Sequence, residues 1–175
     1  SITVPKKESR KQEAPPPEPK KQPPGRGTVL GRIDIPRVKI SAVVREGVED
    51  AILRRAVGHI PETALAGEGG NFALAAHRDT HFRGLRSIRK GDEINFVTDL
   101  GTYKYVVDKL MIVWPEHVEV LEATPDPVIT LVTCYPFNYV GSAPKRFIVR
   151  ARQTAVIPRG KKVADSAPET IPAGS

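Results

Sequence analysis

"TLVTCYPFNYVGSAPKR", residues 130–146, contains the only cysteine of the chain, Cys134. The β-branched residues before the cysteine predict a strand at 128–134. A loop rich in turn-forming residues follows, and Arg146 then opens a second predicted strand at 146–151. The stretch therefore predicts two neighbouring strands, with a thiol at the end of the first and a guanidinium at the start of the second.

Side chains alternate between the two faces of a strand, so the faces of this pair can be assigned. The predicted core positions are Ile129, Leu131, Thr133, Phe147, Val149 and Ala151. Cys134 and Arg146 then share the outer face of what we interpret as an antiparallel pair. A register that places them opposite each other is compatible with this pattern, although the sequence does not fix it.

"NFALAAH", residues 71–77, predicts a third strand that ends at His77. Phe72, Leu74 and Ala76 are expected to face the core, and Asn71, Ala73, Ala75 and His77 to face outward. The small side chains of Ala73 and Ala75 would leave a shallow groove beside the imidazole. We therefore expect an imidazole, a thiol and a guanidinium at strand ends on the outer surface.

These three groups together suit acyl transfer. A thiolate is a strong nucleophile and is favoured by a nearby cation. An imidazole can hold or supply the proton. An arginine can donate hydrogen bonds to the oxyanion that forms. A lone cysteine is more often a small buried hydrophobe, but the outward position of Cys134 at a strand end favours the catalytic interpretation.

The rest of the sequence favours a mostly β fold, a barrel or a sandwich. Further strands are predicted at 92–98 and 102–113, and two more within 28–44, joined by a turn at Pro36. Helical spacing appears at 48–59, with Gly58 as its end, and a short helix is expected at 81–88. The connector 114–127 has room for one helical turn.

Composition divides the 175 residues into three parts. Residues 1–27 hold seven of the seventeen prolines and seven Lys/Arg against three Glu, which predicts a disordered spacer. Residues 28–154 form the expected single domain, and 155–175 are expected to be a flexible tail. The net charge of +7 arises mainly outside the domain, which carries 17 basic and 15 acidic residues and no basic stripe with interleaved aromatics. This distribution argues against nucleic-acid binding.

The chain begins at Ser1 and contains no apolar stretch long enough to span a bilayer. Either the protein is soluble, or an anchor or targeting segment preceded Ser1. A basic, proline-rich arm suits a spacer near a membrane or a cell wall. One cysteine cannot form an internal disulfide.

We expect no cofactor. His77 and His81 have metal-ligand spacing only if both lie on one helix, and no Glu follows His77 as in the zinc-peptidase motif. Asp79 could orient His77, although a turn-capping role is the simpler interpretation. Glu116, Glu119, Glu122 and Asp126 could bind Ca²⁺, but a solvated loop is again simpler, and calcium is not expected to be essential. His59 and His117 are expected at the surface.

The motifs resemble those of sortases, the membrane-anchored cysteine transpeptidases of the bacterial surface. "TLVTC" at a strand end, an arginine opening the next strand and an upstream "AHRDTHF" carry the resemblance. "TCYPFNYVGSAPKRFIVRA", "GRIDIPRVKISAVV" and "LRSIRKGDEI" are most similar to the class D branch. Two positions depart from the family pattern: Ala76 stands where a glycine is expected, and His81 where phenylalanine is common.

The resemblance implies an eight-stranded β-barrel in which Cys134 is the nucleophile, His77 the general acid/base and Arg146 the oxyanion donor. Thr133, Ala75 and Val132 are expected to contact the substrate. The implied substrate is a sorting signal resembling Leu-Pro-x-Thr followed by Gly or Ala, cleaved after Thr through a thioester and passed to an amine. The implied protein is extracytoplasmic, a monomer, and anchored by an N-terminal segment absent from this chain.

Two other classes of function stay open. One is a β-rich cysteine hydrolase, or a cell-wall transpeptidase of another family such as the L,D-transpeptidases, whose motif has a glycine before the cysteine where "LVTCYP" has threonine. The other is a non-catalytic wall-associated domain with an incidental thiol. A thiol reagent distinguishes the non-catalytic domain from the enzymes, because in the folded protein it modifies a cysteine that is exposed and activated.

Overall fold

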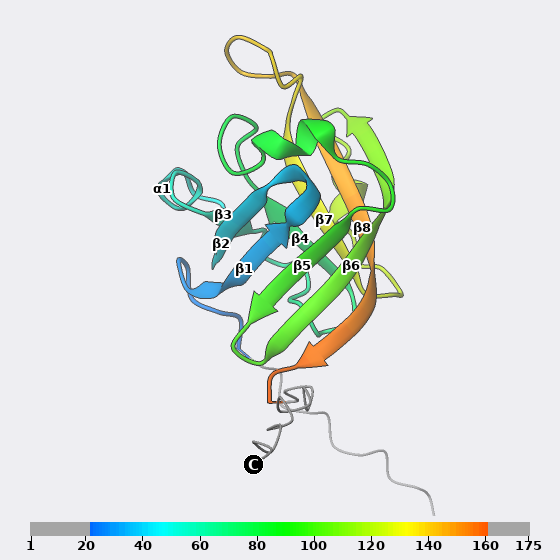
Figure 1. The fold of residues 1–175 in the computed structure, drawn as a ribbon. Helices are drawn as coiled ribbons and strands as arrows, with labels where there is room; N and C mark the ends of the chain where they lie inside the picture. The colour runs from blue at the N-terminus through cyan, green and yellow to red at the C-terminus, as the bar shows by residue number, and fades with distance from the viewer. Residues whose placement is uncertain (1–21, 161–175) are drawn as a thin grey trace, which may run out of the picture.

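The computed structural model describes residues 22–160, which form a closed barrel in the order β1-β2-β3-β4-β7-β8-β6-β5 (Figure 1). The strands are β1 (Val29–Ile35), β2 (Ile40–Glu46), β3 (Val57–His59), β4 (Asn71–Ala75), β5 (Glu93–Thr98), β6 (Gly101–Val113), β7 (Val128–Tyr135) and β8 (Lys145–Pro158). The helices are α1 (Asp50–Leu53) and three short 3-10 helices, η1 (Pro36–Val38), η2 (Arg83–Ser87) and η3 (Val118–Leu121). The predicted fold class, a mostly β closed barrel of eight strands with few short helices, is confirmed.

The core fills the inside of the barrel. Alternate residues of each strand point inward, as the period of two requires. Ile33 and Ile35 of β1, Leu131 of β7 and Val149 of β8 are fully buried there. Each such side chain stabilises the fold by roughly 1.5–3 kcal/mol relative to exposure. The predicted inward faces of β7 and β8 are therefore correct.

The barrel extends beyond the C-terminal boundary that the sequence predicts. β8 continues from residue 154 to Pro158 and remains paired with β6, where Pro158 lies opposite Gly101. Most of the predicted N-terminal spacer, up to residue 21, and most of the predicted tail, from residue 161, lie outside the described residues.

None of the helices within residues 22–160 combines the length and the apolar character that crossing a bilayer requires.

The predicted helix at 48–59 is largely wrong. Only Asp50–Leu53 is helical, and Val57–His59 is strand β3, which pairs with β2 in parallel. Gly58 does not end a helix. A Cβ at this position would lie 2.2 Å from the carbonyl oxygen of Gly47, so the glycine allows two backbone segments to approach closely.

His59 is a second correction, because it is buried rather than at the surface. Its ring is 2% exposed, and Nδ1 lies 2.5 Å from the Oε2 atom of Glu46, which is also buried. Nε2 lies 3.0 Å from the carbonyl oxygen of Ala64. This pair joins the end of β2 to the loop after β3. His117, in contrast, is exposed as expected.

The outer side of β4 is also less open than predicted. Asn71 is buried, and its Nδ2 donates hydrogen bonds to the carbonyl oxygens of Val120 and Glu122 at 2.9 and 3.0 Å. Its Oδ1 accepts a hydrogen bond from the hydroxyl of Thr130 on β7. Ala73 is fully buried as well. The connector between β6 and β7 therefore covers the start of these two strands, and a groove can begin only nearer Ala75.

Candidate active site

The register of β7 and β8 places Cys134 directly opposite Arg146. The two strands are antiparallel, and both residues are half-buried. The alternation that buries Leu131 and Thr133 turns Cys134 outward. The register that was compatible with the sequence is therefore the one adopted, and the thiol and the guanidinium leave neighbouring strands at the same level.

His77 reaches the same end of the barrel because β4 runs parallel to β7. Ala75 lies opposite Val132, and the next residue, Ala76, donates its backbone N–H to the carbonyl oxygen of Val132 at 3.2 Å. The hydroxyl of Thr133 donates to the carbonyl oxygen of Ala76 at 2.8 Å. These two bonds hold the chain alongside β7 up to the residue before His77.

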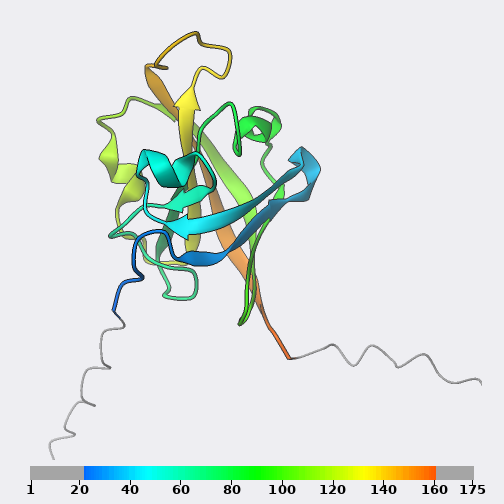
Figure 2. The same ribbon diagram turned by 90° about the vertical axis from the view of Figure 1, so that its left-hand side faces the viewer.

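The three predicted catalytic residues border one pocket of about 440 Å³. Its lining is His77, Arg78, Asp79, Cys134, Gly141, Ser142, Ala143 and Arg146. The loop between β7 and β8 supplies one wall, and the turn after β4 supplies the other. Both views show the β7–β8 loop at the end of the barrel opposite the C-terminal end of β8 (Figures 1 and 2).

Arg146 is held by backbone oxygens. Its Nη1 donates to the carbonyls of Ala143 at 3.2 Å and Lys145 at 2.9 Å. Within residues 22–160, Nε and Nη2 donate no hydrogen bond to the protein. One end of the fork is therefore fixed to the loop, and the remaining donors can serve a group that enters the pocket.

The three predicted substrate-contacting residues differ in exposure. Ala75 and Val132 are half-buried and lie opposite each other on β4 and β7, next to the thiol. Thr133 is 2% exposed, and its hydroxyl is already engaged with the backbone after β4. Contact of these residues with a substrate stays a prediction, and Thr133 has a structural role besides.

Sequence reasoning missed Arg78. Its Nη2 donates to the carbonyl oxygens of Tyr139 and Gly141, at 2.9 and 2.8 Å. Arg78 thus ties the β7–β8 loop to the turn that carries His77. Its position beside His77 was the only available signal, because carbonyl acceptors about sixty residues away leave no mark in the sequence.

His77 and His81 border different pockets, and the lining of the active-site pocket does not include His81. Asp79 is exposed and borders the active-site pocket together with His77. Across the described part of the chain, no three His, Cys, Asp or Glu side chains gather closely enough to hold a metal ion.

A pocket larger than the active-site pocket lacks these reactive groups. It has about 770 Å³ and lies between the ends of β1, β5, β6 and β8, with Gly101 and Pro158 in its wall. Because β8 starts beside Cys134 and ends at Pro158, this pocket is at the opposite end of the barrel. It contains no cysteine or histidine, so we assign the chemistry to the smaller pocket.

A thiol, an imidazole and a guanidinium around one open pocket are the groups that cysteine acyl-transfer enzymes use. The Sortase domain family matches residues 33–154, which is most of the barrel. The chain belongs to the sortase family, whose members are transpeptidases.

Individual relatives agree with this assignment. Sortase D of Bacillus subtilis (strain 168) is 32% identical over 131 residues, which cover 74% of this chain and 66% of the relative. Sortase A of Streptococcus agalactiae is 32% identical over 115 residues, covering 61% of this chain and 47% of the relative. The chain thus spans between about half and two thirds of these relatives.

Solved structures give the same answer. A Sortase D5 transpeptidase of Clostridium perfringens superposes with a TM-score of 0.68 at 29% identity, covering 75% of this chain and 82% of the other. Sortase E1 of Streptomyces coelicolor, solved with a tripeptide in its active site, gives 0.71 at 29% identity, covering 78% and 94%. The predicted resemblance to sortases, class D among them, is confirmed.

Proposed function

We propose that this protein is a cysteine transpeptidase that cleaves a sorting signal resembling Leu-Pro-x-Thr-Gly or Leu-Pro-x-Thr-Ala after threonine and transfers the acyl group to an amine. The observation that carries the proposal is the position of Cys134 opposite Arg146, on a pocket that His77 also borders. Membership of the sortase family supports the same reaction class.

In the first half-reaction, the sulfur of Cys134 attacks the threonine carbonyl carbon. The negative charge that develops on the carbonyl oxygen is stabilised by the free donors of Arg146. The C–N bond then breaks, and the imidazolium of His77 gives its proton to the departing amine. The product is a thioester on Cys134.

In the second half-reaction, an amine attacks the thioester carbon. His77 takes the proton from the amine, and the C–S bond breaks to release the thiolate of Cys134 and the new amide. The active-site pocket is open to solvent, so water can also reach the thioester. Transfer prevails only if a bound amine is held in position, because orientation gives a large rate advantage over water.

The partners follow from this reaction. We propose a sorting-signal-bearing protein as the acyl donor, a surface amine as the acceptor, and a monomeric enzyme without a required cofactor that acts outside the cytoplasm. The N-terminal anchor belongs to the same proposal. Ca²⁺ is not expected to be needed.

The test is an incubation with Leu-Pro-x-Thr-Gly and Leu-Pro-x-Thr-Ala peptides, with and without hydroxylamine or a short peptide with a free N-terminus, followed by mass spectrometry. We expect little product without the amine and a hydroxamate or joined amide with it. Cys134→Ala is the matched inactive control. Equal release of free acid with and without the amine would instead identify a plain cysteine hydrolase.

A further inference from the structure

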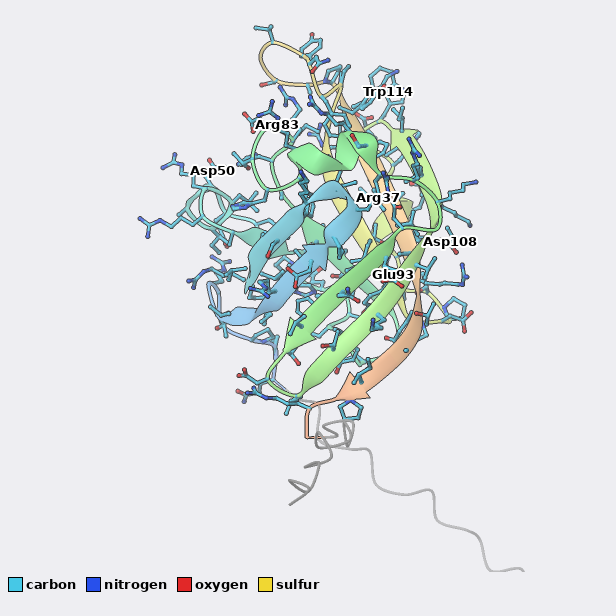
Figure 3. All side chains as sticks on the ribbon, in the orientation of Figure 1. Arg37, Asp50, Arg83, Glu93, Asp108 and Trp114 are labelled. Carbon is cyan, nitrogen blue, oxygen red and sulfur yellow. The ribbon has the colours of Figure 1, made fainter. Side chains whose placement is uncertain are left out.

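A second pocket, of about 430 Å³, lies beside the active site and is strongly basic. Its lining is Arg37, Val38, Lys39, Ile40, Thr80, His81, Arg83, Gly84, Arg86 and Ser87. Four of these residues are Arg or Lys, one is His, and none is acidic. We call it the basic pocket. Arg37 and Arg83 lie at the same end of the barrel, near η2 (Figure 3).

The charges in the basic pocket are unevenly compensated. Arg37 is paired with Asp92, whose carboxylate oxygens lie 2.5 and 2.6 Å from its Nε and Nη2. Among residues 22–160, the side chains of Lys39, Arg83 and Arg86 join neither an ion pair nor a hydrogen bond. All three are exposed. Cations gathered in a concave site raise the local concentration of anions.

The walls of the basic pocket are held together. A Cβ on Gly84 would lie 2.5 Å from the carbonyl oxygen of Val38, so glycine lets η2 approach η1 closely. Arg37 also donates from Nη2 to the carbonyl oxygen of Ser87 at the end of η2. The two basic segments are therefore positioned before any ligand arrives, which lowers the entropic cost of binding one.

We propose that the basic pocket binds a phosphate or pyrophosphate group. The guanidinium groups of Arg83 and Arg86 and the ammonium of Lys39 match a multiply charged oxyanion, because arginine donates two parallel hydrogen bonds to such groups. Thr80 and Ser87 border the pocket as well and have hydroxyl groups that can donate.

The basic pocket adjoins the active-site pocket through one segment. Residues 77–79 border the active-site pocket, and Thr80 and His81 border the basic pocket. A phosphorylated molecule held here therefore contacts the segment that carries His77. The binding itself does not depend on the reaction proposed for Cys134, so either proposal can fail alone.

Inorganic pyrophosphate is the probe, titrated calorimetrically into the folded protein at constant ionic strength. We expect saturable binding that weakens about tenfold or more in Arg83→Gln/Arg86→Gln, since each lost charge-assisted hydrogen bond costs that order of affinity. Arg54→Gln/Arg55→Gln, at and just beyond the end of α1, is the matched control for net charge and should bind like the wild type. Thermal melting checks that every variant is folded.

If pyrophosphate binding does not saturate, or if it weakens equally in both double variants, the proposed phosphate site is wrong.

Vesicles distinguish the source of the phosphate group. Binding to vesicles of anionic phospholipid that pyrophosphate displaces supports a lipid headgroup. Saturable pyrophosphate binding without vesicle binding supports a soluble phosphorylated compound. Vesicle binding that survives saturating pyrophosphate and the Arg83→Gln/Arg86→Gln change, with no pyrophosphate binding, would contradict the proposal.

Discussion

Arg146 shows how neighbouring groups position one side chain. The carbonyls of Ala143 and Lys145 accept hydrogen bonds from one nitrogen of its guanidinium, and the side chain borders the active-site pocket. Because Arg146 lies opposite Cys134, its guanidinium and the thiol lie at the same level along the two strands. A lysine at this position would keep the charge but lose the planar fork.

We therefore expect Arg146→Lys to lower turnover by about two to three powers of ten, the typical cost of losing one oxyanion donor. Steady-state transfer of a sorting-signal peptide to an amine measures it. Arg152→Lys, an exposed position on the same strand, is the control and should leave turnover unchanged. Near-normal turnover in Arg146→Lys would show that this residue supplies only charge, or nothing.

A second prediction for a single residue concerns the proton that His77 gives to the leaving amine. If His77 protonates the leaving amine, then His77→Gln should reduce turnover by about 10²–10⁴-fold, the usual contribution of general acid–base catalysis. The exposed His117 provides a matched His117→Gln control outside the pocket. A His77→Gln enzyme that retains its rate would remove His77 from the mechanism.

At the scale of elements, the β7–β8 loop depends on Arg78. Its two hydrogen bonds to the carbonyls of Tyr139 and Gly141 join this loop to the turn that follows β4. We expect Arg78→Gln to speed hydrogen exchange around residues 139–143 and to raise KM more than it lowers kcat. Arg55→Gln should change neither quantity. Unchanged exchange in the loop would show that the tether is not what orders it.

The ion pair of Arg37 and Asp92 joins η1 to the turn before β5. The hydrogen bond from Arg37 is the main cause that lowers the pKa of Asp92, against the opposing effect of burial. A carboxyl whose pKa is lower in the folded state stabilises the fold above its unfolded pKa, about 3.9, and loses this contribution as the pH falls through the folded pKa.

Asp92→Asn should therefore lower the melting temperature by about 3–6 °C near neutral pH. The gap to the wild type should narrow below about pH 4, where the wild-type carboxyl also begins to take up its proton. Thermal melts across this pH range measure the gap. A difference that does not depend on pH would mean that packing, rather than charge, explains the loss.

At the scale of the whole molecule, the sequence predicts the barrel well where the alternation is regular. The patterns at 128–134 and 146–151 are enough to place the thiol and the guanidinium on one face. The alternation does not predict the structure where contacts between distant segments determine it. Gly58 lies in a strand close to the backbone of Gly47, and His59 is buried beside Glu46.

The basic pocket escapes sequence reasoning for the same reason. Its walls come from residues 37–40 and 80–87, two separate segments that the barrel brings together. The grouping of Cys134, His77 and Arg146 could be predicted from the sequence because β4, β7 and β8 are neighbours and each places its residue near a strand end. Local periodicity therefore predicts which face a residue occupies, whereas only the closed barrel shows what lies opposite it.

The central claim is that Cys134 carries the acyl group between donor and acceptor. Intact-protein mass spectrometry after mixing with a sorting-signal peptide tests it most directly. The account predicts an adduct with the mass of the peptide up to threonine, mapped to Cys134, absent in Cys134→Ala and discharged by an added amine. A Cys134→Ala protein with an unchanged melting temperature and undiminished peptide cleavage would contradict it.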